Sequence, residues 1–325
     1  MKICFLDNTK FEYSYLDKYS PKLRGAETIL INLSENLKNF GHEVTVFNNC
    51  NEEITKNNSN WFNINKINKS MHFDVAIANA DMRLLDNVTA NKKFVISHSL
   101  QSIEKFIRKG QLFSYIKNKP TVCLMGNYHA QNRSKILSFF GTKILDLAID
   151  DLFLKAELSN KIDNNLAIFT SRPDRNLDLL IKIWNEKILP NYTSGKLLIT
   201  PTDTINKNNS IMFRKMSSQK ELIEDLLKSR VYLVPGHKAE VFCLAAEEAR
   251  ELCLPIVTLG IGSLSERVIH EKTGFIAKNE KEFADYTIEL FKNNDLWKNI
   301  KSNLFNLRGS KKWKNSAKYF LDSIC

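Results

Sequence analysis

The amino-acid sequence predicts an α/β protein with two parallel β-sheets, each covered by helices. Short apolar runs alternate with amphipathic stretches of helical length along the chain. This alternation stops once, in a polar stretch from about Leu154 to Asn165, and then restarts. A chain of 325 residues is also longer than one typical core requires. We therefore expect two domains, residues 1–153 and 154–325.

The elements of the first domain follow from short β-rich runs and longer amphipathic stretches. Strands are predicted at Ile3–Leu6, Glu43–Phe47, Val75–Ala78, Phe94–Ile96, Val122–Leu124 and Ile144–Leu147. Helices are predicted at Thr28–Phe40, Ser102–Arg108 and Ala130–Phe139. The stretch Asn51–Ser70 is rich in Asn, Lys and Ile without clear periodicity, which favours a variable surface excursion.

The second domain repeats the strand and helix alternation. Strands are predicted at Leu166–Phe169, Lys196–Thr200, Val231–Val234 and Ile256–Leu259, with helices from near Leu177, at Gln219–Leu227 and at Val241–Cys253. Strand and helix alternation implies right-handed crossovers and two Rossmann-like units. Because ligands of such sheets bind beyond the carboxyl ends of the strands, we expect two units that face a central cleft.

Composition and charge exclude several classes of protein. A hydrophobic fraction of 43% is ordinary for a folded protein. No run of about 18 apolar residues occurs, and MKICFLDN has a strand pattern instead of that of a signal peptide, so a cytoplasmic location is expected. The cysteines are scattered without paired spacing, which favours reduced thiols over a disulfide framework or a zinc site. They are Cys4, Cys50, Cys123, Cys243, Cys253 and Cys325.

The net charge of +11 does not indicate a nucleic-acid-binding protein. Residues 1–150 hold 20 basic and 14 acidic residues, and the rest of the chain holds 27 basic and 22 acidic residues. The excess of positive charge is therefore spread over both halves. No block of five or six basic residues occurs. Two interpretations stay open, a solvated surface rich in Lys and Asn, and attraction to anionic lipid headgroups.

The stretch from Val231 to Glu266 carries the clearest functional signal. Its strand is broken at Pro235 and Gly236, and a segment of helical composition follows. A strand that leads into a helix N-terminus presents unpaired N–H groups and the positive end of the helix dipole, which favours phosphate. Glu240 and Glu248 flank this place, and carboxylates accept hydrogen bonds from hydroxyl groups. The arrangement suits a nucleoside diphosphate sugar.

These residues resemble the retaining GT-B glycosyltransferases of family 4, also named glycosyl transferases group 1. Glu240 and Glu248 stand at E-x7-E spacing before Pro255 and the turn GIGSLSE, as in the donor-site signature of the family. The resemblance covers nearly the whole chain, since LRGAETILINLSENLKNFGHEVTVF, TSRPDRNLDLLIKIW and EKTGFIAKNEKEFADYTIELF follow the family's other motifs in order. It implies the GT-B architecture and allows the last helix to pack back on the N-terminal domain.

The resemblance assigns roles to the acidic pair and the residues after Glu240. Glu240 is expected to contact hydroxyls of the transferred sugar and Glu248 the ribose. The family usually has glycines after the first Glu, in an EGFG pattern, whereas this chain has Val241 and Cys243. The backbone amides of this segment are expected to bind the donor, while its side chains occupy space near it. The residues are Val241, Phe242, Cys243 and Leu244. Glu247 and Glu251 are expected to be ordinary acids on the helix surface.

Four further residues match functional residues of the family. Arg172 and Arg175 follow a predicted strand, and guanidinium groups there would hold the diphosphate as charge develops on the leaving group. Gly25 opens the first helix and permits close approach of a ligand, although Arg24 replaces the family's first glycine. His98 matches the N-domain histidine that faces the transferred sugar, with a histidine satisfied by the backbone as the alternative. His129 is a weaker candidate.

The resemblance thus predicts a retaining transfer without a metal ion, with His98, Glu240 and Arg175 as catalytic residues. PTDT offers only a lone acid, Asp203, and no metal-binding DxD sequence. The co-substrate would be a UDP- or GDP-sugar, whose base is left open because backbone groups near Phe213–Met216 can recognise it. The acceptor would be a glycan, lipid or small molecule. Synthesis of a cell-surface glycan or glycolipid would place the protein in the cytoplasm or at the inner face of the membrane. An epimerase, a phosphorylase-like enzyme and an inactive binding subunit are the alternatives.

Overall fold

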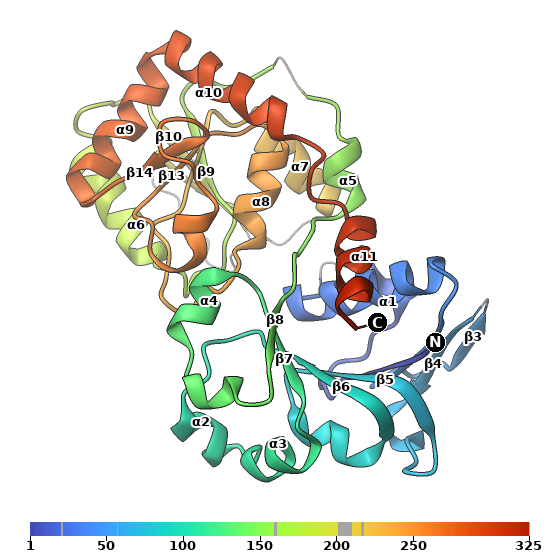
Figure 1. Cartoon of the computed structure of the whole chain (residues 1–325). Coiled ribbons are helices and arrows are strands. Elements are labelled where there is room, and N and C mark those ends of the chain that lie inside the picture. The colour runs from blue at the N-terminus through green and yellow to red at the C-terminus, as the bar shows by residue number, and fades with distance from the viewer. Residues whose placement is uncertain (21, 57, 159–160, 201–209, 216–217, 325) are drawn as a thin grey trace. The chain divides into compact units, whose positions relative to one another are not determined.

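The computed structural model describes residues 1–20, 22–56, 58–158, 161–200, 210–215 and 218–324. The chain divides into two compact units, a first unit of Met1–Ala148 with Trp313–Cys325 and a second unit of Ile149–Lys312. The division falls before the predicted break after residue 153, because helix α5 (Asp151–Lys155) packs against helices α7 and α8 of the second unit. Figure 1 shows the elements of both units.

The first unit contains a sheet whose described strands have the order β3-β4-β2-β1-β5-β6-β7-β8. Every neighbouring pair is parallel except β3 and β4. The strands are β1 (Lys2–Leu6), β2 (Glu43–Asn48), β3 (Ile54–Lys56), β4 (Ser59–Asn63), β5 (His72–Asn79), β6 (Thr89–Ile96), β7 (Thr121–Leu124) and β8 (Thr142–Ile144). The α-helices are α1 (Gly25–Asn39), α2 (Ile103–Arg108), α3 (Leu112–Asn118) and α4 (Asn127–Asn132). Short helices lie at η1 (Tyr15–Asp17), η2 (Ile64–Lys66), η3 (Met82–Asn87) and η4 (Lys135–Ser138).

The C-terminal helix α11 (Trp313–Ile324) belongs to the first unit, where it packs beside α1 (Figure 1). Its buried side chains include Trp313 and Phe320, and the Phe320 ring meets the Phe94 ring of β6 edge to face at 5.7 Å between centroids. Lys92 Nζ also donates to the Ile324 carbonyl at 2.6 Å. The chain therefore returns to the unit in which it began.

The second unit contains a parallel sheet whose described strands have the order β11-β10-β9-β12-β13-β14. The strands are β9 (Leu166–Phe169), β10 (Lys196–Ile199), β11 (Ile211–Phe213), β12 (Val231–Leu233), β13 (Ile256–Thr258) and β14 (Gly274–Ile276). The helices are α5, α6 (Leu177–Ile183), α7 (Gln219–Lys228), α8 (Leu244–Glu251), α9 (Glu280–Lys292) and α10 (Asn294–Leu307), with a π-helical turn η5 (Trp184–Ile188) and a short helix η6 (Gly262–Glu266).

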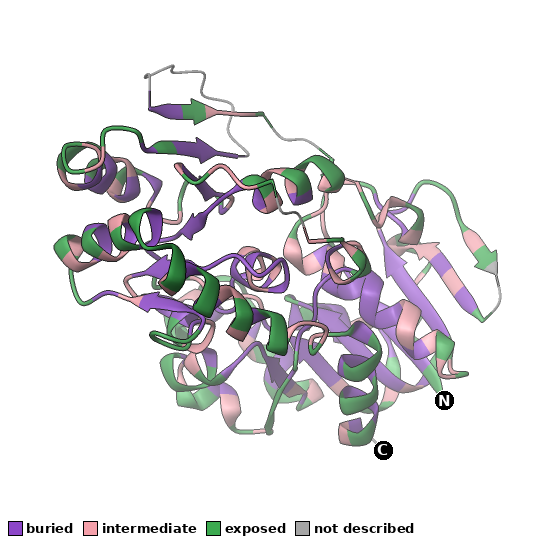
Figure 2. Cartoon of the chain, turned by 90° about the horizontal axis from the view of Figure 1, so that it is seen from above, coloured by how far each residue is buried: buried purple, intermediate pink, exposed green. Residues whose placement is uncertain are grey.

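The strands of both sheets are the most buried parts of the chain (Figure 2). All four residues of β9 are buried, as expected for a central strand covered by helices on both faces. Trp61 and Trp184 are fully buried aromatic residues of the first and second units. Because this apolar packing fixes the strand ends, it also fixes the loops that leave them.

Four predicted elements differ from the structure. Asn51–Ser70 was expected to be a surface excursion, but it contains β3 and β4, and Trp61 anchors β4 in the core. The predicted helix Ala130–Phe139 is divided into α4 and η4, because Arg133 has extended backbone. The strand predicted at Ile144–Leu147 ends at Ile144. The helix predicted from Val241 begins at Leu244, because Cys243 is left-handed at φ 61°.

Candidate functional site

The second sheet reverses its strand order between β9 and β12. From β9 the chain goes to β10 and β11 on one side, and it returns to β12 on the other side. Loops that leave neighbouring strands at such a point diverge and open a crevice at the carboxyl edge, where α/β proteins bind ligands. Residues 170–176 leave β9, and residues 234–243 leave β12. The arginine loop and the glutamate loop predicted from the sequence are therefore neighbours.

Three loops are tied together around Glu240. Asn176, which precedes α6, donates its side-chain amide to the Gly236 carbonyl and joins the arginine loop to the glutamate loop. The Ser263 amide donates to the Glu240 carbonyl at 3.0 Å, which adds the loop after β13. Gly262 has φ +75°, and a Cβ there would overlap the His237 carbonyl oxygen. Glycine is needed at this close approach, which holds the Glu240 backbone in place.

The carboxylate of Glu240 is left with an unused acceptor. Burial raises the pKa of Glu240, while the nearby Arg175 guanidinium and a hydrogen bond with the Cys243 thiol lower it. Its Oε2 atom is buried and has no hydrogen-bond partner among the described residues. A buried acceptor without a donor is costly, so a ligand hydroxyl that supplied one would be bound favourably.

The N-terminus of α8 is open for an anion. No side chain of the described residues makes a regular capping hydrogen bond there, and the N-cap residue is Cys243. The Cys243 thiol lies beside the Ala246 amide of the first turn, and it also contacts Glu240 and Ser171. The side chains of Val241, Phe242 and Cys243 are buried, so these residues offer a ligand mainly their backbone. Leu244 is the first residue of α8, and its amide points along the same helix dipole.

An acidic residue that the sequence reasoning did not single out lies between the two arginines. Asp174 accepts from Arg172 Nε at 3.0 Å and from Arg175 NH1 at 2.9 Å. The pKa of Asp174 is lowered, because these hydrogen bonds and charges outweigh the opposing effect of burial. The Arg175 side chain is 16% exposed and that of Arg172 is 63% exposed. Arg175 is therefore the better-positioned cation, and the sequence Arg-Pro-Asp-Arg was the available signal for Asp174.

Glu248 lies on α8 in an environment that opposes its ionisation. Burial, with a smaller repulsion from the Asp150 carboxylate, raises the pKa of Glu248 from its ordinary value of 4.5 to about 7. Asp150 itself caps α5 by accepting from the Leu152 amide at 2.9 Å. Glu248 therefore changes charge near neutral pH, as groups at functional sites often do.

The two other acids of α8 do not lie on its solvent face, contrary to the prediction. Glu247 is 2% exposed and pairs with Arg267 at 2.8 Å and with Arg250 at 2.7 Å. Glu251 is 1% exposed and accepts from the Gly309 amide at 2.9 Å. Both carboxylates face packed neighbours, since α10 covers this helix, and they serve the structure of the second unit.

The first unit has a polar cluster at its own strand-order reversal, between β1 and β5. Asp7 follows β1 and is buried, and it accepts from the Tyr13 hydroxyl at 2.6 Å and from Asn79 Nδ2 at 3.1 Å. The Asn79 Oδ1 atom in turn lies 2.5 Å from His98 Nε2. His98 follows β6, the strand beside β5, so three strand ends bring this chain of side chains together.

His98 and the neighbouring His129 are both neutral. Burial and the neighbouring His129 lower the pKa of His98 to about 4, and burial lowers the pKa of His129 to about 4 as well. His129 Nδ1 accepts from the Met125 amide at 3.3 Å, and its Nε2 lies 3.0 Å from the Ser99 carbonyl. His129 thus holds the loop that carries His98.

Gly25 is the first residue of α1, as the sequence predicted for the glycine loop. Arg24 precedes it, with its guanidinium over the Phe11 ring at 5.8 Å from the centroid. The buried Glu27 carboxylate accepts from the Arg24 amide at 3.1 Å and from the Thr9 hydroxyl at 3.0 Å. This carboxylate occupies part of the helix N-terminus, which makes Gly25 a weaker anion site than the start of α8.

Some predicted positions lie beyond these clusters. Asp203 and Met216 are outside the described residues, whereas Phe213 ends β11 and Arg214 pairs with Asp225. Cys4, Cys50, Cys123, Cys243 and Cys253 are buried free thiols. Within the part of the chain that the structure describes, no three His, Cys, Asp or Glu side chains come together as metal ligands would. No helix in that part is long and apolar enough to cross a membrane.

A family model matches part of the second unit. Residues 195–306, which include Glu240 and Glu248, match the family model Glycosyl transferases group 1. The chain is a glycosyltransferase. The matched residues lie within the second unit, and the arginine loop and the whole first unit lie outside them. A search of curated protein sequences found no significant match.

Solved structures show that this glycosyltransferase has the GT-B fold. Anabaena Alr3699/HepE in complex with UDP superposes with a TM-score of 0.72 at 15% identity, over 100% of this chain and 99% of that chain. Sucrose-phosphate synthase from Thermosynechococcus elongatus superposes with a TM-score of 0.71 at 13% identity, over 99% of this chain and 97% of that chain. WaaG, a glycosyltransferase involved in lipopolysaccharide biosynthesis, superposes with a TM-score of 0.69 at 11% identity, over 99% of both chains. The predicted fold class is thereby confirmed.

Proposed function

We propose that this glycosyltransferase moves a sugar from a nucleoside diphosphate sugar to an acceptor hydroxyl with retention of configuration and without a metal ion. One observation carries the proposal. At the strand-order reversal of the second unit, the unpaired Oε2 of Glu240, the Arg175 guanidinium and the uncapped start of α8 come from adjoining loops. A hydrogen-bond acceptor for sugar hydroxyls therefore lies beside hydrogen-bond donors for the phosphates.

The diphosphate would bind to cations and amides. The amides of residues 241–244 and the start of α8 supply fixed donors, and Arg175 supplies a positive charge. As the glycosidic bond breaks, its electron pair moves to the diphosphate oxygen and negative charge grows there. Preorganised donors at such a place stabilise the transition state by about 3 to 4 kcal/mol for one donor in measured cases. Arg172 adds a second, more exposed cation.

The acids would hold the two sugars of the donor. Glu240 accepts hydrogen bonds from the transferred sugar through its unpaired oxygen, and Glu248 accepts from the ribose hydroxyls. The positive charge that develops on the anomeric carbon is also favoured near the Glu240 carboxylate. Because acceptor attack and departure of the diphosphate occur on one face, orientation by these contacts supplies much of the rate.

His98 would act as a hydrogen-bond acceptor for a sugar hydroxyl. It is neutral above pH 4, and its Nε2 is engaged with Asn79, so Nδ1 is the nitrogen left for a substrate. A histidine in this state orients a hydroxyl and does not supply a proton at neutral pH.

The donor proposed first is a UDP-sugar, and a GDP-sugar second. HepE was solved with UDP and with UDP-glucose, which supports testing uridine nucleotides before others. The acceptor is proposed to be a glycan or glycolipid of the cell surface, made at the cytoplasmic side of the membrane. The lipopolysaccharide role stated for WaaG supports this choice.

Product analysis tests the proposal. The purified protein is incubated with UDP-glucose, UDP-N-acetylglucosamine or GDP-mannose, with EDTA and a panel of glycan and lipid-linked acceptors. We expect release of the nucleoside diphosphate and an axial glycoside from an axial donor by proton NMR, unchanged by EDTA. A rearranged nucleotide sugar, a sugar phosphate, or nucleotide binding without turnover on any acceptor would contradict transfer in favour of an epimerase, a phosphorylase or a binding subunit.

A further inference from the structure

Three short segments of the first unit expose large apolar side chains to solvent. Phe113 and Ile116 of α3 are 75% and 56% exposed, and Ile107 of α2 is 54% exposed. Ile136 of η4 and the following Phe139 are 55% and 81% exposed. Single exposed apolar residues are common on soluble proteins, but a group of them marks an interaction site. We call these five residues the apolar ridge.

The segments that carry the ridge are neighbours, because they meet at Tyr115 of α3. The Tyr115 ring contacts the Phe106 ring of α2 at 5.6 Å and the Phe140 ring at 4.9 Å between centroids. The Tyr115 hydroxyl donates to the Ile136 carbonyl at 3.3 Å. The segments α2, α3 and η4 thus pack on one another through Tyr115, and the ridge residues are exposed residues of these same neighbouring segments.

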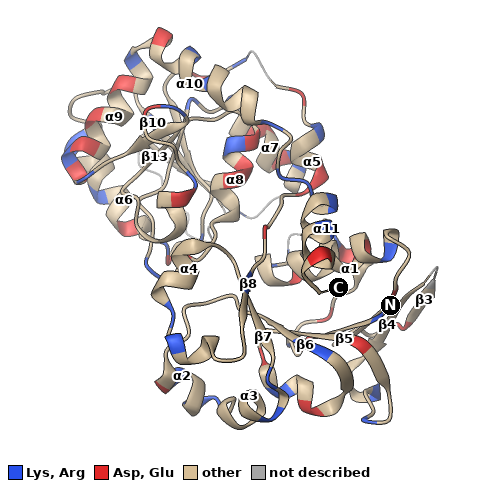
Figure 3. Cartoon of the chain, in the orientation of Figure 1, with Lys and Arg blue, Asp and Glu red and all other residues tan. Residues whose placement is uncertain are grey.

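Positive charge surrounds the ridge. Residues 101–119 hold five basic residues and a single acid, Glu104, and Lys135 and Lys143 lie in the segment that follows α4. Figure 3 shows the basic residues along α2, α3 and the turn that joins them. An amphipathic surface with cations beside aromatic and aliphatic groups is typical of proteins that lie on anionic membranes.

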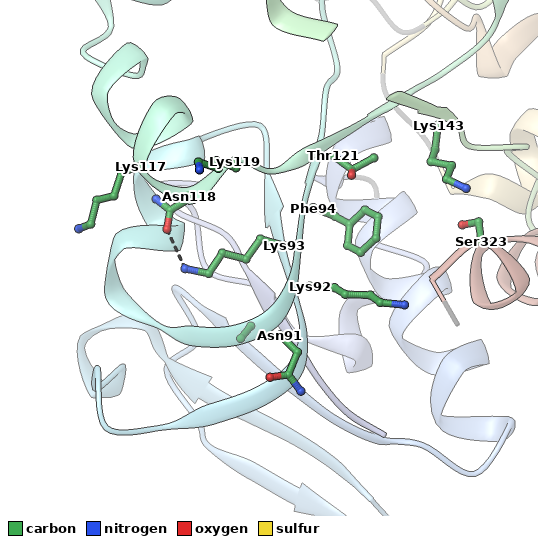
Figure 4. A pocket seen from close by; sticks show the side chains of 11 residues that line it. Asn91, Lys92, Lys93, Phe94, Lys117, Asn118, Lys119, Thr121, Lys143 and Ser323 are labelled. Carbon is green, nitrogen blue, oxygen red and sulfur yellow. Dashed lines mark hydrogen bonds between the residues drawn. The ribbon is translucent and has the colours of Figure 1, made fainter. Parts of the chain in front are cut away.

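A pocket of about 580 Å³ opens where α3 ends, at the amino edge of β6 and β7. Its charged side chains are all lysines, namely Lys92, Lys93, Lys117, Lys119 and Lys143. In Figure 4, Lys92 and Lys143 extend toward Ser323 of α11, whereas Lys93 reaches Asn118, to which it donates at 2.7 Å.

The lysines of the pocket have few acidic partners. Lys117 pairs with Asp86 at 3.3 Å. The side-chain ammonium groups of Lys119 and Lys143 form no hydrogen bond or ion pair with any residue in the described part of the chain. Thr121 adds a hydroxyl that can donate to a phosphate oxygen, whereas the Asn118 amide already donates to Asp86 and to the Ser114 carbonyl. The pocket is therefore suited to a phosphate group.

We propose that the apolar ridge and the lysine pocket together form a docking surface for a membrane of anionic phospholipids. A headgroup phosphate would enter the pocket, and Phe113, Ile116 and their neighbours would enter the acyl boundary. Helix α3 links the two parts, since its exposed face ends in Lys117 and Lys119 follows it. A free phosphate would use the lysines and leave the ridge in water, whereas a lipid uses both. The inference does not depend on the transfer reaction.

Vesicle sedimentation of the full chain tests this surface. The vesicles are phosphatidylcholine alone or an equal mixture with phosphatidylglycerol. We expect a partition coefficient about tenfold higher for the mixture, falling as salt screens the charges. The double variant K119E/K143E should lower binding to the mixture by about tenfold or more. The double variant F113S/I116S should lower it by a similar order, through lost burial in the acyl boundary.

Matched variants separate the surface from general effects. K281E/K298E makes the same charge change on α9 and α10, and Y319S removes an exposed aromatic group of α11. Both controls should bind the mixture as the wild type does, and circular dichroism should show that all variants fold.

Four results would overturn the proposal. The first is equal binding to both kinds of vesicle, and the second is unchanged binding by both surface variants. The third is saturation of the pocket by inorganic pyrophosphate, seen as a thermal shift that K119E/K143E abolishes, without any vesicle binding. The fourth is a dimer in analytical ultracentrifugation that F113S/I116S dissociates, because the ridge would then serve a second copy of the chain.

Discussion

His98 Nε2 lies 2.5 Å from Asn79 Oδ1, and this contact fixes where the imidazole proton resides. Asn79 Nδ2 donates to the Asp7 carboxylate, which only accepts, so the amide must present Oδ1 to the histidine. An amide oxygen cannot donate, and therefore His98 carries its proton on Nε2. The Nδ1 lone pair is then free to accept from a ligand.

Replacement of Asn79 tests this relationship. In the wild type, nitrogen NMR of the histidine side chains should show His98 as the Nε2–H tautomer. In N79L the contact is lost, and we expect a mixture of the two His98 tautomers. We also expect kcat to fall by about tenfold, which is the size of effect expected for one orienting hydrogen bond. The fold should persist, since Tyr13 still donates to Asp7. A pure Nδ1–H tautomer in the wild type would contradict the assignment.

The raised pKa of Glu248 predicts a pH dependence of donor binding. The ionised carboxylate accepts from both ribose hydroxyls, so the affinity for UDP-glucose, whose phosphates stay ionised, should rise as pH passes through about 7. Titration calorimetry between about pH 6 and 8 should show a change of about tenfold. E248Q should bind weakly with no such change. A wild-type affinity that falls with pH would refute this role.

The same residue predicts a pH dependence of stability. Its folded pKa exceeds the ordinary value of 4.5, so the folded state binds more protons between pH 4.5 and about 7. Stability should therefore fall as pH rises through that window, by about 1 to 3 kcal/mol from this group. Urea unfolding of E248Q should show a smaller fall than the wild type. Identical pH profiles of the two proteins would contradict the raised pKa.

The two arginines should differ in importance. Arg175 is largely buried beside Glu240, and Arg172 is mostly exposed. We expect R175A to lower kcat/KM by about 100-fold and R172A by less than about tenfold. K182A, which removes a half-exposed cation from α6, is the matched control and should have wild-type activity. Equal losses of kcat/KM in R175A and R172A would show that burial does not determine the importance of the two arginines.

Asp174 is predicted to weaken donor binding. Its carboxylate bridges both guanidinium groups, and a diphosphate must displace it or share the arginines with it. D174N removes the charge with little change in shape and should bind UDP about threefold to tenfold more tightly in calorimetry. A weaker affinity in D174N would mean instead that Asp174 orients the arginines for the ligand.

The sequence predicted which strand ends carry the candidate site residues better than it predicted the local path of the chain. Arg172, Arg175 and Glu240 follow strands whose apolar runs were clear, and the parallel sheet brought those strand ends together. Asp174 was missed, and so were Asp7 and Asn79, which connect to His98, because hydrogen bonds between distant residues leave no periodic pattern. The start of α8 was placed too early, since the left-handed conformation of Cys243 depends on Ser171 and Glu240 around it. Glu247 and Glu251 were assigned to the surface, because Arg267 and Arg308, which pair with them, lie on other segments.

A crystal structure of the protein with UDP tests the central claim most directly. The account predicts the diphosphate at the amides of residues 241–244, in contact with Arg175, and the ribose hydroxyls within hydrogen-bond distance of Glu248. A nucleotide bound elsewhere, with Glu248 and Arg175 away from it, would contradict the account.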